Sequence, residues 1–274
     1  MQVSSGGMVF DVEVSGPRDG EPVLLLHGFP QSRRAWDRVT PVLNEAGLRT
    51  IAPDQRGYSP GARPAGVEAY ALPLLAGDAV GILDALGVET AHVVGHDWGA
   101  VVAWYVAAHH SERVRTLTAV SFPHLEAFWY ALRHDPVQRQ LSQYLAYFMS
   151  PESTSAMLAD DAAQLRSLFG DAVEAEQVEH YVALQSQPGV LDATLNWYRS
   201  GSLLAEEGLG QVPVPTTYVW SDGDMAVSRL AVERTAEHVT GPYRFVALEG
   251  VTHWQPEQAS GAVAEEILRR VRRQ

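Results

Sequence analysis

The stretch Val93-Val94-Gly95-His96-Asp97-Trp98-Gly99-Ala100 decides the fold of this chain. It has the pattern of an apolar strand that ends in Gly-x-Asp-x-Gly and continues into a helix of small residues. Gly95 and Gly99 allow the strand and the helix to approach closely, so the side chain between them stands exposed above the sheet. Asp97 is ionised at neutral pH and needs no base to attack a saturated carbon. The stretch therefore predicts a nucleophilic carboxylate; the alternative is a structural N-cap of the helix.

Short apolar segments alternate with helix-length segments along most of the chain. The apolar and β-branched segments, which we expect to be strands, are 23–26, 49–52, 91–95, 117–121, 216–220 and 243–248. The segments with apolar residues at helical spacing are 36–46, 72–86, 99–110, 228–238 and 255–273. This alternation predicts an α/β protein with a mostly parallel, twisted sheet and helices on both of its faces.

One long segment breaks this alternation. Residues 123–212 show helical patterns rich in Ala, Leu, Gln and aromatic residues, and no convincing buried strand. We therefore expect an inserted all-helical cap over this segment, between a first core part at 1–122 and a second core part at 213–274. Such a cap would lie over the carboxyl edge of the sheet, where open α/β folds bind ligands.

The composition excludes several kinds of chemistry. The 274 residues include no cysteine, which removes disulfides, thiolate nucleophiles and cysteine metal sites. All 20 basic residues are arginine, so no lysine is present to form a Schiff base. The net charge of −13 disfavours nucleic acid as a partner. Residues 1–7 lack signal-peptide features and no long apolar run occurs, so we expect a cytoplasmic protein without a membrane partner.

Two later expected strands each lead into titratable residues. Asp224 follows one of them, and His253 follows the other. Because parallel strands end at the same edge of a sheet, we expect both residues near Asp97, in the chain order nucleophile, acid, histidine. Asp224 would orient the imidazole, and His253 would then take a proton from water. Asp222 is the rival acid, and Glu126 is a weaker one.

The loop His27-Gly28-Phe29-Pro30 follows the strand expected at 23–26. Its glycine allows a tight backbone path and its proline stiffens that path. We expect the backbone N–H groups of Phe29 and Trp98 to face the carboxyl group of Asp97 as an oxyanion hole. This assignment depends on position alone, and the alternative is an ordinary turn.

These motifs together resemble those of a known family. They are His27-Gly28-Phe29-Pro30, Asp54-Gln55-Arg56-Gly57-Tyr58-Ser59, Gly95-His96-Asp97-Trp98-Gly99-Ala100, Asp224 and Gly250-Val251-Thr252-His253-Trp254. The set resembles the α/β-hydrolase family, and within it the epoxide hydrolases with an aspartate nucleophile, which are close to the haloalkane dehalogenases. The resemblance implies the α/β-hydrolase fold, a covalent intermediate on Asp97, and a reaction that requires no metal or organic cofactor.

In that family two cap tyrosines bind the oxygen of the opening epoxide. The segment Tyr144-Leu145-Ala146-Tyr147-Phe148 resembles the first tyrosine site, with Tyr144 as the better match, and Leu195-Asn196-Trp197-Tyr198-Arg199 resembles the second through Tyr198. We expect Tyr147 to be an ordinary packing residue. An opening epoxide develops an alkoxide that needs a proton, so a pair of phenols favours epoxides over halides as substrates.

The sequence therefore predicts an enzyme that converts a small, apolar epoxide and water into a vicinal diol through an ester of Asp97. The first alternative is a haloalkane dehalogenase with the same nucleophile, in which the indole N–H groups of Trp98 and Trp197 bind the halide. The second alternative is a ligand-binding or pathway protein with a vestigial triad, because a fold alone does not establish activity.

Overall fold

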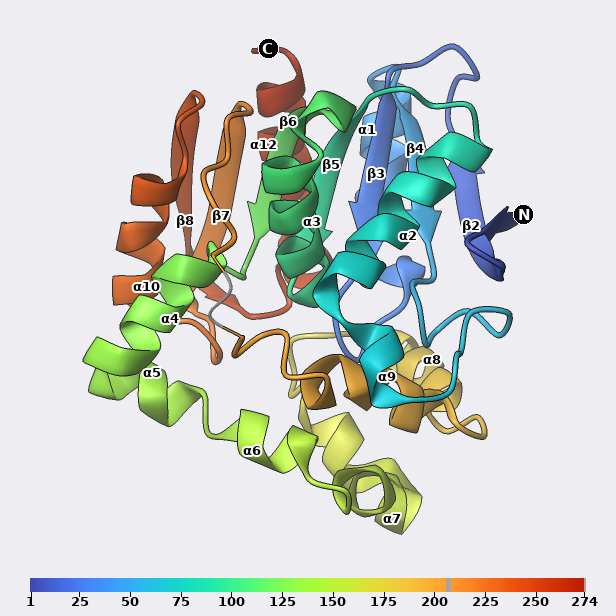
Figure 1. The fold of residues 1–274 in the computed structure, drawn as a ribbon, viewed down its shortest axis with the longest axis vertical. Helices are drawn as coiled ribbons and strands as arrows, with labels where there is room; N and C mark the ends of the chain where they lie inside the picture. The colour runs from blue at the N-terminus through green and yellow to red at the C-terminus, as the bar shows by residue number, and fades with distance from the viewer. Residues whose placement is uncertain (206–207, 274) are drawn as a thin grey trace.

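The computed structural model describes residues 1–205 and 208–273, and its centre is a sheet of eight strands (Figure 1). The strands lie in the order β1-β2-β4-β3-β5-β6-β7-β8. Their bounds are β1 (Gln2–Ser5), β2 (Met8–Ser15), β3 (Pro22–Leu26), β4 (Arg49–Pro53), β5 (Ala91–His96), β6 (Val114–Val120), β7 (Thr216–Gly223) and β8 (Tyr243–Thr252). β1 and β2 pair antiparallel with their neighbours, whereas all pairings from β4 to β8 are parallel. The predicted α/β class with a mostly parallel sheet is confirmed.

All six expected strands are present, with somewhat different ends. β1 and β2 are absent from the sequence prediction. The signal for β2 is its alternation, because Phe10 and Val12 are buried whereas Glu13 is exposed. Both strands lie at one edge of the sheet, away from the ends of β5, β7 and β8.

Helices cover both faces of the sheet (Figure 1). In the view of Figure 1, α2 (Leu72–Ala85) and α3 (Trp98–His109) cross in front of the sheet. Behind it lie α1 (Thr40–Glu45) and α12 (Ser260–Val271), which contact each other. Two shorter helices, α10 (Arg229–Arg234) and α11 (Gln255–Gln258), follow β7 and β8.

Two expected helices have different bounds in the structure. The helix expected at 36–46 begins only at Thr40, because Arg33–Trp36 first form a separate 3₁₀ turn, η1. The helix expected at 255–273 is divided into α11 and α12, because Ala259 leaves the helical region with φ −128° and ψ 36°.

Among the described residues, six helices lie between β6 and β7. They are α4 (Leu125–His134), α5 (Pro136–Leu141), α6 (Tyr144–Met149), α7 (Ser153–Ser167), α8 (Ala175–Gln185) and α9 (Val190–Arg199). Figure 1 shows them across the end of the sheet at which the parallel strands finish. The division into a cap at 123–212 and core parts at 1–122 and 213–274 stays a prediction. No helix in the described ranges combines the length and the apolar character that crossing a bilayer requires.

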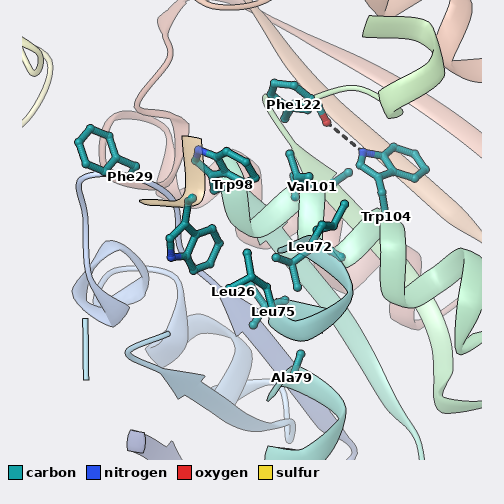
Figure 2. Packing of buried hydrophobic residues seen from close by; sticks show 14 of the residues in the cluster. Leu26, Phe29, Leu72, Leu75, Ala79, Trp98, Val101, Trp104 and Phe122 are labelled. Atoms are coloured by element: carbon teal, nitrogen blue, oxygen red, sulfur yellow. Dashed lines mark hydrogen bonds between the residues drawn. The ribbon is translucent and has the colours of Figure 1, made fainter. Parts of the chain in front are cut away.

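The buried core supports the N-terminal end of α3. Figure 2 shows Leu26 of β3 beside Leu75 of α2, and Val101 of α3 belongs to the same buried cluster. Farther along α3, the indole N–H of Trp104 donates to the carbonyl oxygen of Phe122 at 3.0 Å (Figure 2). Burying each large apolar side chain contributes about 1.5–3 kcal/mol, so this packing fixes α3 against the sheet.

Candidate active site

Asp97 lies in a sharp turn between β5 and α3. Its φ of 52° and ψ of −122° are unusual for a residue other than glycine. A Cβ atom on Gly95 would lie 2.1 Å from the carbonyl oxygen of Gly99, and one on Gly99 would lie 2.1 Å from that of Leu26. Only glycine fits these two positions, so the chain forms the strained strand-to-helix turn that the sequence predicts.

The carboxyl group of Asp97 is buried and bound by backbone amides. The N–H of Phe29 donates to Oδ1 at 2.8 Å, and the N–H of Trp98 also donates to the carboxyl group. Burial raises the pKa of Asp97, whereas the charge of His253 and the two amide hydrogen bonds oppose that rise. The structure thus brings the two predicted backbone donors onto the predicted carboxylate.

His253 lies between two carboxyl groups. Its Nε2 is 3.6 Å from Oδ2 of Asp97, and its Nδ1 is 3.1 Å from Oδ1 of Asp224. A carboxylate can only accept, so Nδ1 of His253 carries the proton in the contact with Asp224. Burial by itself lowers the pKa of His253, but the charges of Asp224 and Asp97 outweigh burial and raise it to about 9.

Asp224 is held by several donors besides His253. The hydroxyl of Ser121 donates to its Oδ2 at 2.7 Å, and the N–H of Ala226 donates to its Oδ1 at 2.9 Å. Burial by itself raises the pKa of Asp224, but the charge of His253 and these hydrogen bonds hold it below its usual value. An ionised Asp224 therefore fixes the ring orientation of His253.

The two rival acids lie elsewhere. Asp222 is exposed and accepts from the N–H of Gly250 at 2.8 Å. Glu126 lies in the first turn of α4, where it pairs with His238 at 3.2 Å and accepts from the N–H of Gly210 at 3.0 Å. Neither of these two carboxyl groups contacts His253, so the geometry favours Asp224 as its partner.

A pocket of about 420 Å³ lies against this group of residues. Its lining includes Asp97 and His253 and also the two tyrosines that the resemblance points to, Tyr144 and Tyr198. Much of the remaining lining is apolar and includes Phe29, Leu141, Phe148, Leu168 and Trp254. A largely apolar pocket with a few convergent polar groups is typical of a small-molecule site.

The two pocket tyrosines come from different cap helices. Tyr144 begins α6 and Tyr198 lies near the end of α9, with their ring centres 6.3 Å apart. Burial and the charge of Asp97 raise the pKa of both phenols, so both hydroxyls stay protonated and can donate. Tyr147 is 38% exposed, and its hydroxyl donates to Gln164, outside the pocket.

The tryptophans do not form the halide site that the dehalogenase alternative requires. The indole N–H of Trp197 donates to the carbonyl oxygen of Arg56 at 2.9 Å, and Trp197 does not line the pocket. The ring of Trp98 packs edge-on against that of Tyr198, with ring centres 5.2 Å apart, and Trp98 does not line the pocket either. Neither indole therefore belongs to the lining of the pocket that contains Asp97 and His253.

Sequence reasoning missed three polar residues around this site. Ser121 supports Asp224, while Gln31 and Glu257 form a buried pair behind the loop that contains Phe29. Ser121 could have been found as the residue that ends the expected strand 117–121. Gln31 directly follows the His-Gly-Phe-Pro motif, but Glu257 has no local signal, because its contact with Gln31 joins residues 226 positions apart.

Comparisons with known proteins agree with this architecture. The AB hydrolase superfamily protein YfhM of Bacillus subtilis is 32% identical over 99% of this chain and 97% of its own length. Epoxide hydrolase A of Mycobacterium tuberculosis is 30% identical over 97% of this chain and 95% of its own length. A solved structure described among novel epoxide hydrolases from metagenomes of hot environments has a TM-score of 0.89 and 28% identity, over 99% of this chain and 97% of that chain.

The family assignment follows from the extent of these matches. A family model described as the alpha/beta hydrolase fold matches residues 21–259. Two relatives that cover nearly the whole chain are at least 30% identical to it, and one of them is named an epoxide hydrolase, as the motifs predict. The chain belongs to the α/β-hydrolase family.

Proposed function

We propose that this protein hydrolyses small, apolar epoxides to vicinal diols through an ester of Asp97. The observation that carries the proposal is the lining of one pocket by a carboxylate, an imidazole and two phenols. The name of the relative from M. tuberculosis, an epoxide hydrolase, supports the same reaction. The apolar lining from Phe29, Phe148 and Trp254 supports an apolar substrate body.

In the first step, a carboxylate oxygen of Asp97 attacks an epoxide carbon. Oδ1 is bound by the amide of Phe29, so Oδ2 is the oxygen that is free to attack. The carbon–oxygen bond of the epoxide breaks, and its oxygen takes a proton from Tyr144 or Tyr198. The product of this step is a β-hydroxyalkyl ester of Asp97, and the tyrosine regains its proton from solvent.

In the second step, water attacks the carbonyl carbon of the ester. His253 takes a proton from the water, and the negative charge develops on Oδ1, where the amides of Phe29 and Trp98 stabilise it. The intermediate then collapses, the bond to the alkyl oxygen breaks, and that oxygen takes the proton from His253. The diol leaves, and the carboxyl group of Asp97 gives its remaining proton to the neutral His253, which restores the carboxylate.

The order of these steps suits the electrostatics of His253. In the free enzyme the charge of Asp97 helps to raise the pKa of His253 to about 9, which keeps the imidazole protonated at neutral pH. Ester formation removes that charge, so the pKa of His253 falls. The imidazole then loses its proton more readily, at the stage when a base is needed.

A trapped ester tests the proposal. His253→Gln removes the base but leaves the carboxylate and both phenols, so alkylation of Asp97 should continue while hydrolysis of the ester stops. Intact-protein mass spectrometry after incubation with styrene oxide and other aryl and alkyl epoxides should show one added substrate mass, and peptide mapping should locate it at Asp97. The exposed His109, replaced by Gln, is the matched control and should accumulate no adduct.

Two other outcomes would favour the alternatives. Halide release from haloalkanes that is unaffected by Tyr144→Phe and Tyr198→Phe would indicate a dehalogenase. No turnover and no adduct with any epoxide or haloalkane, together with tight binding of a pocket ligand, would indicate a binding protein with a vestigial triad.

A further inference from the structure

Glu257 is a buried carboxyl group on the side of the active site away from the substrate pocket. Its Oε1 accepts from the amide of Gln31 at 2.7 Å and from the hydroxyl of Tyr181 at 2.8 Å. Its Oε2 is buried and has no hydrogen-bond partner in the described residues. Burial is costly for a carboxylate and raises the pKa of Glu257 to about 7. The buried carboxyl group of Glu257 therefore lowers the stability of the fold, and its contacts indicate what it contributes in return.

The amide of Gln31 connects this carboxyl group to the oxyanion loop. Its Oε1 accepts from the N–H of Gly28 at 3.2 Å, and Gly28 directly precedes the amide of Phe29 that binds Asp97. An ionised Glu257 can only accept, so Gln31 must direct its NH₂ group towards Glu257 and its oxygen towards Gly28. The carboxylate therefore selects the orientation of the amide that holds the loop.

A second branch of the same network reaches the backbone of His253. The Nδ1 atom of His96 is 3.0 Å from Oε1 of Gln31, and its Nε2 is 2.8 Å from the carbonyl oxygen of His253. Burial lowers the pKa of His96 to about 3, so its ring is neutral and its single N–H donates to only one of these two oxygens. Gln31 thus holds the loop that binds one oxygen of Asp97 by a hydrogen bond, and it contacts the segment that carries the base only through the ring of His96. Both of these segments act in the hydrolysis step of the proposed mechanism.

We propose that Glu257 is a positioning residue for hydrolysis of the ester, which acts through Gln31 on the oxyanion loop. This role rests on the proposed function. The negative charge of Glu257 also stabilises the protonated His253 that forms when water is deprotonated, together with the charge of Asp224. Both effects favour the second step over the first, because the first step requires neither a base nor an oxyanion hole.

Single-turnover kinetics can separate the two steps. Glu257→Gln keeps the size and the accepting oxygen but removes the charge, and the exposed Glu265, replaced by Gln, is the matched control. At pH 8.5 we expect the decay of the ester to slow about tenfold, with formation of the ester changed less than twofold. The ester should therefore accumulate in Glu257→Gln but not in wild type or in Glu265→Gln.

The pH dependence of the ester decay rate distinguishes a positioning role of Glu257 from a merely structural one. Glu257 is protonated in wild type below its pKa of about 7, so the ratio of wild-type to Glu257→Gln decay rates should fall towards one at pH 6. In the ester Asp97 is uncharged, so the charged groups that act on His253 in this comparison are Asp224 and Glu257, and only Glu257 differs between the two proteins. Equal decay rates at pH 8.5, or a ratio that is constant with pH, would overturn the proposal.

A second variant keeps the test valid if Glu257→Gln does not fold. Gln31→Met removes the connecting amide and should slow ester decay to a similar extent, with formation of the ester again little changed. The double variant should be no slower than the slower single variant, because both changes interrupt one path. Additive losses would overturn the proposed path, and the absence of any ester in His253→Gln would overturn the proposed function and this role with it.

Discussion

In the proposed function, the phenol hydroxyls of Tyr144 and Tyr198 set the substrate class. Each is kept protonated by burial beside the charge of Asp97, so each can donate to the oxygen of an opening epoxide. The resemblance to the family was needed to select Tyr144 and Tyr198, because tyrosines at helical spacing are usually packing residues. Their common pocket depends on two separate helices, which the local sequence does not relate to each other.

Replacing either tyrosine by phenylalanine should slow formation of the ester. We expect Tyr144→Phe and Tyr198→Phe each to reduce the alkylation rate by about 10- to 100-fold, and the double variant to lose far more, because one phenol can partly replace the other. Rapid-quench single turnover with an epoxide measures this rate directly. Tyr147→Phe, at an exposed tyrosine, is the matched control. An equal loss of alkylation rate in Tyr147→Phe would contradict the assignment of Tyr144 and Tyr198.

At the scale of elements, the turn from β5 to α3 is the part of the fold that the sequence predicts best. Its two glycines have a steric reason that is visible in the motif. The four residues of β1 and the eight of β2 were missed because neither strand leads into a motif residue. The contact between Gln31 and Glu257 could not be predicted either, because it forms only after η1 and α11 have folded against the sheet.

Two glycine-to-alanine changes in neighbouring helices should have opposite effects on stability. Gly99→Ala would place a methyl group 2.1 Å from the carbonyl oxygen of Leu26, so we expect the free energy of unfolding to fall by roughly 3 kcal/mol or more. Gly77 lies in the exposed part of α2 with open space around it, so Gly77→Ala should raise that free energy by about 0.5–1 kcal/mol. Urea unfolding at pH 7.5 measures both changes, and equal effects would contradict the account of the turn.

At the scale of the whole molecule, several buried histidines couple folding to pH. His124 is fully buried at the start of α4, where its Nδ1 accepts from the N–H of Glu126 and its Nε2 has no partner in the described residues. Burial and the charge of His238 lower the pKa of His124 to about 3. The unfolded chain therefore binds a proton below about pH 6.5 that the folded protein does not bind.

The direction of this effect can be tested by measuring the free energy of unfolding of the whole protein at several pH values. The contribution of His124 to stability is present above pH 6.5 and is lost as the pH falls towards 3, by up to about 1.4 kcal/mol per pH unit. His124→Asn keeps an N-cap acceptor but does not titrate, so its unfolding free energy should fall less steeply between pH 6 and pH 4. Urea unfolding at each pH measures the difference in slope. Parallel curves of unfolding free energy against pH for wild type and His124→Asn would contradict this prediction. His109→Asn is the exposed control.

In the proposed reaction, an oxygen of Asp97 bonds to the substrate before water takes part. The most direct measurement is a single turnover in water enriched in oxygen-18, with enzyme in excess over an epoxide, followed by mass spectrometry of the diol and of the peptide that contains Asp97. We expect label in the carboxyl group of Asp97 and none in the diol, because water attacks the ester carbonyl. Label in the diol after that first turnover, with an unlabelled Asp97, would show direct attack of water on the epoxide and would contradict the account.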